Sequence, residues 1–299
     1  MGGGSDMPTT YAHYRFGRDV YKRLPQRIQE MVRSHGGLYN IGLHGPDLLF
    51  YFKVFQKNPV NQTGFAMHDR PGKEFFEQAA LVMQKKSPRR IRKNSLRQSS
   101  RAKAGKPRPS AFVSYVTSAK YAYIFGFLCH FALDSSCHPY VEHMVRETGI
   151  SHSEIEAELD RDLMLHDGLN PMTCRPTPHL RARLFYGGII SRFFPDITAR
   201  QILTSIRSMR LCCNLLAPSG KKLRFIARFV MKGSHLPKAV QEMVIKEQPD
   251  PKCAPITREL ERRYQKAIPM AAELIVNFME HVEEGTPLDK RFNHTFGEM

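Results

Sequence analysis

Residues 112–138 read FVSYVTSAKYAYIFGFLCHFALDSSCH, and apart from the histidines only Lys120 and Asp134 carry charge in this stretch. Wound into a helix, the stretch would present apolar side chains on every face. A helix of that kind is typical of the buried centre of a bundle, because no side of it can be left in water without exposing apolar surface. We therefore expect a central helix here, around which the rest of the chain packs.

Apolar residues elsewhere recur at helical spacings of three, four and seven, and alternating strand patterns are nearly absent. Pro25 should interrupt the first helical stretch or start a second helix. Ser151, followed three residues later by Glu154, predicts the start of a helix. The fold expected from these patterns is all-α, a single domain of roughly eight to ten helices. The expected helical stretches besides the central one are 11–33, 73–84, 152–165, 180–194, 198–216, 221–232 and 257–284.

The chain has 299 residues, of which 41% are hydrophobic and 10% aromatic, a composition that excludes wholesale disorder, collagen and a coiled-coil rod. No stretch approaches the roughly 18 apolar residues of a membrane span. Residues 1–6 resemble a flexible leader before a domain at 7–299. Six cysteines without a CxxC pair, and no secretory leader, predict reduced thiols and a cytoplasmic location.

The basic excess is concentrated in one segment. Residues 85–108 hold eleven Lys or Arg and no acid, against a net charge of +17 for the whole chain. Few of these residues are apolar, so we expect an exposed, mobile insertion between two helical regions. Its partner would be an anionic membrane surface or nucleic acid, and the alternative is a solvated loop with no dedicated partner.

The central helix also carries a row of metal-ligand residue types. His130, Asp134 and His138 are four residues apart, so they project from nearly the same face of a helix. Pro139 follows at once, and we expect the helix to kink or end there. Ionisable groups on an apolar helix are costly unless they are paired or bound to metal, and imidazole with carboxylate is a donor set that zinc accepts.

A second row follows, with His152 and Glu156 four apart and Asp160 one turn further along the same face. Upstream, His13, Asp47 and His68 each lie in a short polar interruption of apolar sequence. A structural polar network is the alternative to metal binding. The two rows in neighbouring helices favour a metal site with eight candidate ligands: His13, Asp47, His68, His130, Asp134, His138, His152 and Glu156.

The order of these residues resembles the zinc-dependent phospholipase C family, whose helical fold is shared with single-strand-specific zinc nucleases. The phrases TTYAHYRFG (9–17), IGLHGPDLLFYF (41–52) and GFLCHFALDSSCHPYVEH (126–143) are most similar to an uncharacterised bacterial branch of that family. The resemblance covers roughly residues 7–165. It implies a cluster of two or three zinc ions.

By position, the resemblance assigns Asp47, His68, His130 and Asp134 to one ion. It assigns His138, His152 and Glu156 to a second ion, and His13 with a bridging Asp134 to a third. The chain departs from the family pattern in three ways. His138 follows Asp134 after four residues instead of six, and the gap from Asp47 to His68 is longer than in secreted members. Those members also use the amino group of an N-terminal tryptophan as a ligand, and this chain has no tryptophan.

The function expected is a metal-dependent hydrolase of phosphodiester bonds, of the phospholipase C type, with metal-activated water as the nucleophile and Asp47 as the catalytic carboxylate. The substrate would be a phosphodiester, with a phospholipid as the leading example. One alternative is a nuclease on the same scaffold, whose bases would stack on aromatic residues such as Tyr11, Phe50, Tyr51, Phe52 and Tyr140. The other is a non-catalytic protein that binds metal or nucleic acid.

Overall fold

A computed structural model of the chain describes residues 10–54, 56–85, 109–216, 245 and 248–297. It confirms the all-α fold, since these residues form helices and no strand beyond an isolated antiparallel bridge between Pro71 and Thr295. The α-helices are α1 (Tyr11–Tyr21), α2 (Gln26–Ser34), α3 (Gly36–Gly42), α4 (Pro59–His68), α5 (Gly72–Gln84), α6 (Pro109–Thr148), α7 (His152–His166), α8 (Leu184–Ile190), α9 (Ala199–Leu216) and α12 (Ala254–Glu284). Short 3₁₀ helices are η1 (Gly45–Tyr51), η2 (Ser191–Phe193) and η3 (Lys290–Asn293).

Most of the predicted helices are present, and their ends follow the expected signals. Pro25 lies at the N-terminal boundary of α2 and separates it from α1. Ser151 caps α7, and its hydroxyl oxygen accepts the backbone N–H of Glu154 at 3.3 Å. Three predictions fall outside the described residues: the leader 1–6, the helix 221–232 and, except for Lys85, the basic segment 85–108. The domain boundaries at 7–299 therefore stay a prediction.

Helix α6 differs from expectation at its C-terminal end. A kink or an end is expected at Pro139, and the helix does not end there but continues to Thr148. Proline has no N–H for the carbonyl four residues earlier, so the turn before it loses a hydrogen bond. The guanidinium of Arg263, on α12, donates to the carbonyl of Ser136 at 3.2 Å and lies over the ring of Tyr140, 4.8 Å from its centroid. Contacts from α12 therefore support the helix where the proline weakens it.

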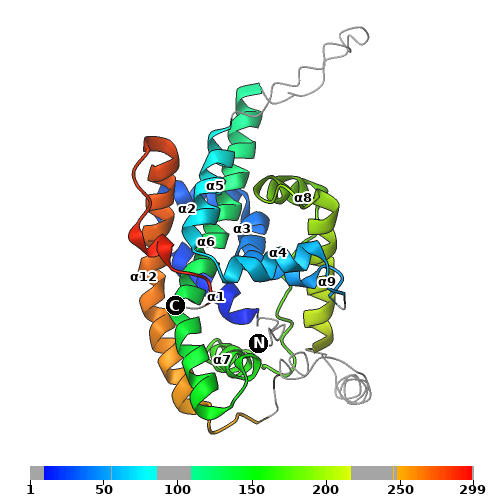
Figure 1. Cartoon of the computed structure of the whole chain (residues 1–299), viewed down its shortest axis with the longest axis vertical. Helices are drawn as coiled ribbons and strands as arrows, with labels where there is room; N and C mark the ends of the chain where they lie inside the picture. Colours follow the sequence, from blue (N-terminus) through cyan, green and yellow to red (C-terminus); the bar gives the residue numbers. More distant parts are fainter. Residues whose placement is uncertain (1–9, 55, 86–108, 217–244, 246–247, 298–299) are drawn as a thin grey trace.

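Helix α6 forms the centre of the molecule, with α1, α2, α3, α5, α7, α8 and α12 packed against it (Figure 1). Helix α3 approaches it closely at a pair of glycines. A Cβ atom on Gly42 would collide with the carbonyl of Tyr123, and one on Gly126 with the carbonyl of Tyr39. Glycine at both positions lets the two backbones touch, which brings the residues that follow α3 up to α6.

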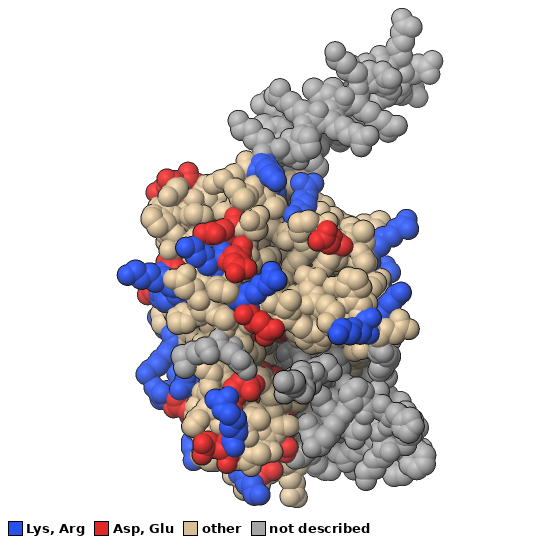
Figure 2. Space-filling view, in the orientation of Figure 1, with Lys and Arg blue, Asp and Glu red and all other residues tan. Residues whose placement is uncertain are grey.

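The surface contrasts with this apolar interior. On the face shown in Figure 2, Lys and Arg side chains are interspersed with Asp and Glu. Among the described residues, no helix is both long enough and apolar enough to cross a membrane. Residues 119–134 of the long central helix are all buried, so the ionisable side chains among them need partners.

Candidate metal centre

The row predicted on α6 forms as expected, since the helix continues past Pro139. His130, Asp134 and His138 lie on consecutive turns. Nε2 of His130 lies 2.8 Å from Oδ2 of Asp134, and Nε2 of His138 lies 3.7 Å from Oδ1 of the same carboxylate. His130 and Asp134 are 1% and 2% exposed. The helix thus holds a carboxylate between two imidazoles inside the core.

Helix α7 brings the second row against the first. Oε1 of Glu156 lies 3.2 Å from Nε2 of His138 and 3.1 Å from Nε2 of His152. The cap at Ser151 starts α7 at His152, so this imidazole and Glu156 face α6 one turn apart. These three side chains form a compact group in which one carboxylate oxygen faces two ring nitrogens.

The three upstream residues come from α1, η1 and α4. Nε2 of His13 lies 3.4 Å from Oδ1 of Asp134, and its ring stacks on His130 with centroids 4.5 Å apart. Oδ1 of Asp47 lies 2.9 Å from Nε2 of His68 and 3.7 Å from Nε2 of His130. All eight predicted ligands therefore converge in one region, although their roles as ligands stay a prediction.

A glycine with an unusual backbone conformation allows η1 to reach the cluster. Gly45 has a φ of +44°, and a Cβ atom at this position would collide with the ring of His130. Any other residue would be strained there and would also displace the imidazole. Two residues later Asp47 lies buried, 2% exposed, at the edge of the same ring.

The structure contains three groups of side chains that could each hold a metal ion. Within each group, the ligand atoms lie within 4.8 Å of one another. One group matches the set implied by the family resemblance, namely His138, His152 and Glu156. The other two share His130, which groups with Asp47 and His68 on one side and with His13 and Asp134 on the other. Asp134 therefore groups with His13 rather than with Asp47, and it also faces His138 in the third group.

The nitrogen and oxygen atoms of the cluster are arranged more like ligands of a bound cation than like partners in hydrogen bonds with one another. Oδ1 of Asp47, Oδ2 of Asp134 and Nε2 of His130 are buried, and none of them has a hydrogen-bond partner in the described part of the chain. They are nevertheless close to neighbouring donor atoms, as the 2.8 Å between His130 and Asp134 shows. Atoms whose lone pairs all point at one metal ion would lie close together in this way without forming hydrogen bonds to one another. Nitrogen and carboxylate oxygen are also the ligand atoms that zinc takes in proteins.

The buried carboxylates and imidazoles of the cluster stabilise each other's charged forms. Burial opposes charge on His130, but Asp134 and Asp47 outweigh it and raise the pKa of this imidazole to about 9. Burial also opposes charge on Glu156, yet His152 and His138 hold its pKa well below the usual range. A metal ion would have to displace the protons on these imidazoles, so binding would release protons and strengthen as the pH rises.

Two supporting residues were not assigned roles from the sequence. Oε1 of Glu142 lies 2.6 Å from Nδ1 of His152, which fixes the ring and leaves Nε2 for the cluster. Glu142 follows His138 by four residues, so its place on the same face of α6 could have been read from the spacing.

Asp160 binds backbone N–H groups at the start of α1, a role that its position one turn after Glu156 on α7 did not indicate. It accepts the backbone N–H groups of Thr10, Tyr11 and Ala12 at 3.2, 3.0 and 2.7 Å. It therefore caps α1 immediately before His13. Its three partners lie almost 150 residues earlier in the chain, so no local pattern could reveal the contact.

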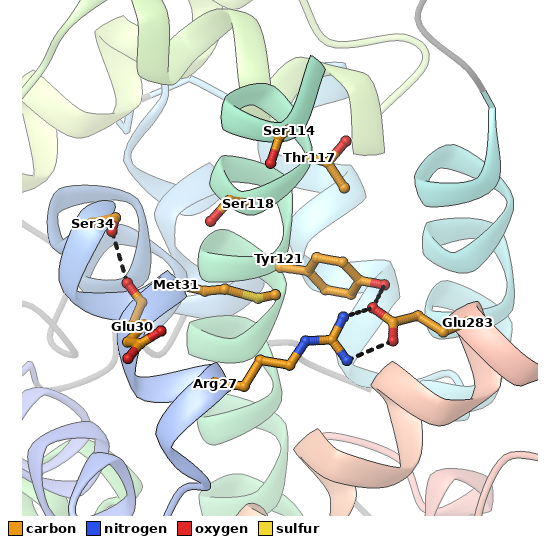
Figure 3. A pocket seen from close by; sticks show the side chains of 9 residues that line it. All are labelled: Arg27, Glu30, Met31, Ser34, Ser114, Thr117, Ser118, Tyr121 and Glu283. Carbon is orange, nitrogen blue, oxygen red and sulfur yellow. Dashed lines mark hydrogen bonds and ion pairs between the residues drawn. The ribbon is translucent and has the colours of Figure 1, made fainter. Parts of the chain in front are cut away.

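A separate hollow of about 420 Å³ lies between α2, α6 and the end of α12 and contains none of the predicted ligands (Figure 3). The cation in its lining is already neutralised, because the two terminal nitrogens of Arg27 donate to the two carboxylate oxygens of Glu283 at 2.9 and 2.7 Å. This hollow therefore offers little for an anionic ligand.

Comparison with known proteins agrees with this geometry. Residues 12–188 match the family model described as zinc dependent phospholipase C, and the match contains all eight predicted ligands. No curated protein and no solved structure matches the chain. The family match spans more than half of the 299 residues and confirms the resemblance found in the motifs. The chain therefore belongs to the zinc-dependent phospholipase C family, and it is a metal-dependent hydrolase.

Proposed function

We propose that the chain hydrolyses phosphodiester bonds, with a phospholipid as its leading substrate class. The observation that carries the proposal is the convergence of five histidines and three carboxylates from α1, η1, α4, α6 and α7, with buried donor atoms left unpartnered. Two or three zinc ions would be held by His13, Asp47, His68, His130, Asp134, His138, His152 and Glu156. Zinc, when bound, supplies Lewis acidity toward phosphate oxygens and lowers the pKa of water toward neutrality.

The residues themselves would position the substrate and move a proton. Asp47 is the carboxylate we assign as base, because its Oδ1 faces the rings of His68 and His130 and would bind the ion, which leaves its second oxygen to accept a proton. Nδ1 of His68 bonds the carbonyl of Gly64 at 2.9 Å, which fixes the ring and turns Nε2 toward Asp47. The attacking water would pass its proton to the second oxygen of the Asp47 carboxylate, and the burial of this side chain excludes competing solvent.

The proposal is tested with Asp47→Asn and a chromogenic phosphodiester. The amide keeps the shape and one oxygen of the side chain, so the fold and most of the zinc should remain, while turnover should fall by at least about a hundredfold. Asp69→Asn is the matched control, since Asp69 is exposed and follows His68 directly. Full activity in Asp47→Asn would show that Asp47 is not the base.

Asp134→Ala should behave differently from Asp47→Asn. Asp134 faces His13, His130 and His138, so its loss should lower zinc content and thermal stability together with activity. A protein that keeps its zinc after this substitution would contradict the bridging role that we assign to Asp134.

A nuclease on the same scaffold is the second candidate, and it rests on the basic segment 85–108. The aromatic residues that would stack bases give it little support, since Tyr11, Phe50 and Tyr51 are buried in the core. Turnover of phosphatidylcholine and of single-stranded DNA, measured side by side, separates the two candidates. If zinc is bound and neither substrate nor the chromogenic diester is hydrolysed, the non-catalytic alternative replaces both.

A further inference from the structure

A second hollow, of about 400 Å³, lies beside the first turn of α1 and has an unusual lining. Its polar and aromatic walls come from α1, α3 and the chain around residues 178–186, and include Tyr14, Asn40, His179, Arg181, Arg183 and Tyr186. Among the residues that the structure describes, no Asp or Glu lines it, and none of the eight predicted metal ligands does so. The hollow is thus a separate cationic site within the size range of small-ligand pockets.

The positive charge of this hollow is uncompensated among the described residues. Arg181 and Arg183 are exposed, and neither takes part in an ion pair there. The guanidinium of Arg183 lies over the ring of Tyr186, 5.6 Å from its centroid, and that of Arg18 lies 5.9 Å from the centroid of Tyr14. The two arginines that line the hollow, Arg181 and Arg183, raise the local concentration of anions, and their planar donor sets match phosphate oxygens.

His179 adds a buried ring nitrogen, Nδ1, that has no hydrogen-bond partner among the described residues. Its ring stacks on Tyr14 with centroids 4.0 Å apart, and its Nε2 lies 2.8 Å from Nε2 of His44. Burial lowers the pKa of His179 to about 3, so the ring is neutral and one of the two Nε2 atoms donates to the other. In the tautomer in which His44 donates, Nδ1 of His179 carries a hydrogen that finds no acceptor among the described residues.

We propose that this hollow binds a phosphomonoester group, with Arg181 and Arg183 supplying the charge and His179 a neutral donor. A phosphomonoester is favoured over a singly charged anion because two arginines without a carboxylate between them match a dianion. The inference does not depend on the proposed hydrolysis, since none of the hollow's residues belongs to the metal cluster. Binding and turnover can therefore fail separately.

The chain has no tryptophan, so Tyr186→Trp places a single fluorescent reporter in the wall of the hollow. Titration of this full-length variant with inorganic phosphate should give a saturable change in emission. Adding Arg181→Ala and Arg183→Ala should raise Kd by at least about tenfold, the factor for losing charge-assisted hydrogen bonds. The pair Arg207→Ala and Arg210→Ala is the matched control, because it removes two exposed arginines of α9 that lie outside the hollow and should leave Kd unchanged.

Further arms identify the source of the phosphate. Glycerol 3-phosphate tests a soluble ligand, and phosphatidylcholine vesicles with and without phosphatidic acid test a lipid head group. Tighter binding in either arm supports the site and names its source. The proposal is overturned if phosphate gives no saturable change, if the two arginine pairs behave alike, or if an acidic peptide binds as well as phosphate. Should Tyr186→Trp fail to fold, calorimetry of phosphate binding to the parent and to Arg181→Ala/Arg183→Ala gives the same comparison.

Discussion

Replacing Asp160 with alanine tests how the fold holds His13 in place. The carboxylate of Asp160 accepts three backbone N–H groups at the start of α1, and the residues that supply them are buried. Leaving one buried backbone N–H without its partner costs about 1–3 kcal/mol, and loss of a helix cap typically costs about 1 kcal/mol. The three bonds share one carboxylate and are not additive, so we expect a loss of about 3 kcal/mol in the free energy of unfolding.

That loss corresponds to a fall in Tm of about 6–12 °C. Thermal unfolding measures it, with Asp162→Ala as the control, because Asp162 lies half-buried on the same helix and accepts none of the three N–H groups. Zinc content should fall with stability in Asp160→Ala, since His13 follows the capped residues directly. A Tm within about 2 °C of the control would refute the reasoning.

The cost of this substitution should depend on pH. Burial raises the pKa of Asp160 from 3.8 to about 7, although the three N–H groups oppose this shift. The folded state therefore binds more protons than the unfolded state between these two values. The stabilisation from Asp160 is complete below about pH 4 and declines as the pH rises through 7. Chemical unfolding should show a larger difference between Asp160→Ala and Asp162→Ala at pH 5 than at pH 8, and the reverse order would contradict the shift.

Two further predictions concern the second zinc group and the basic segment. Glu142→Gln removes the carboxylate that orients His152 at 2.6 Å, and zinc affinity should fall about 10- to 100-fold in competition with a chromogenic chelator. Glu147→Gln, an exposed change on the same helix, should leave affinity unchanged, and equal affinities in the two variants would contradict a supporting role for Glu142. Replacing residues 85–108 with a Gly/Ser segment of equal length should leave Tm within about 2 °C, because the segment has too little apolar surface to join a core. A larger fall would show that it packs against the rest of the chain.

The helices that could be predicted are those with long apolar periodicity or a clear boundary residue. Helix α6 is apolar on every face, and Pro25 and Ser151 mark the starts of α2 and α7. The short elements α3 and η1 carry too few residues for a periodic signal, and they depend on tertiary contacts such as that between Gly42 and the carbonyl of Tyr123. Of the two outcomes expected at Pro139, a kink or an end, the end does not occur, and the contacts of Arg263 that support the helix there come from a distant part of the chain.

The parts of the candidate site that lie on a single helix could be predicted from the spacing of their residues. Spacing of four placed His130, Asp134 and His138 in one row and His152 with Glu156 in another. It could not show that His130 groups with Asp47 and His68 as well as with His13, because those contacts depend on how α1, η1 and α4 pack around α6. Residues such as Asp160, which act on backbone far away in sequence, leave no local pattern at all.

The most direct test of the account is elemental analysis of the protein purified from a zinc-supplemented culture, beside Asp134→Ala prepared in the same way. Three groups of converging ligands predict two or three zinc ions per chain in the parent. Asp134→Ala, which loses the carboxylate that faces three histidines, should bind fewer. A parent protein that is folded and contains no zinc would contradict the central claim and would leave the eight side chains as a buried polar network.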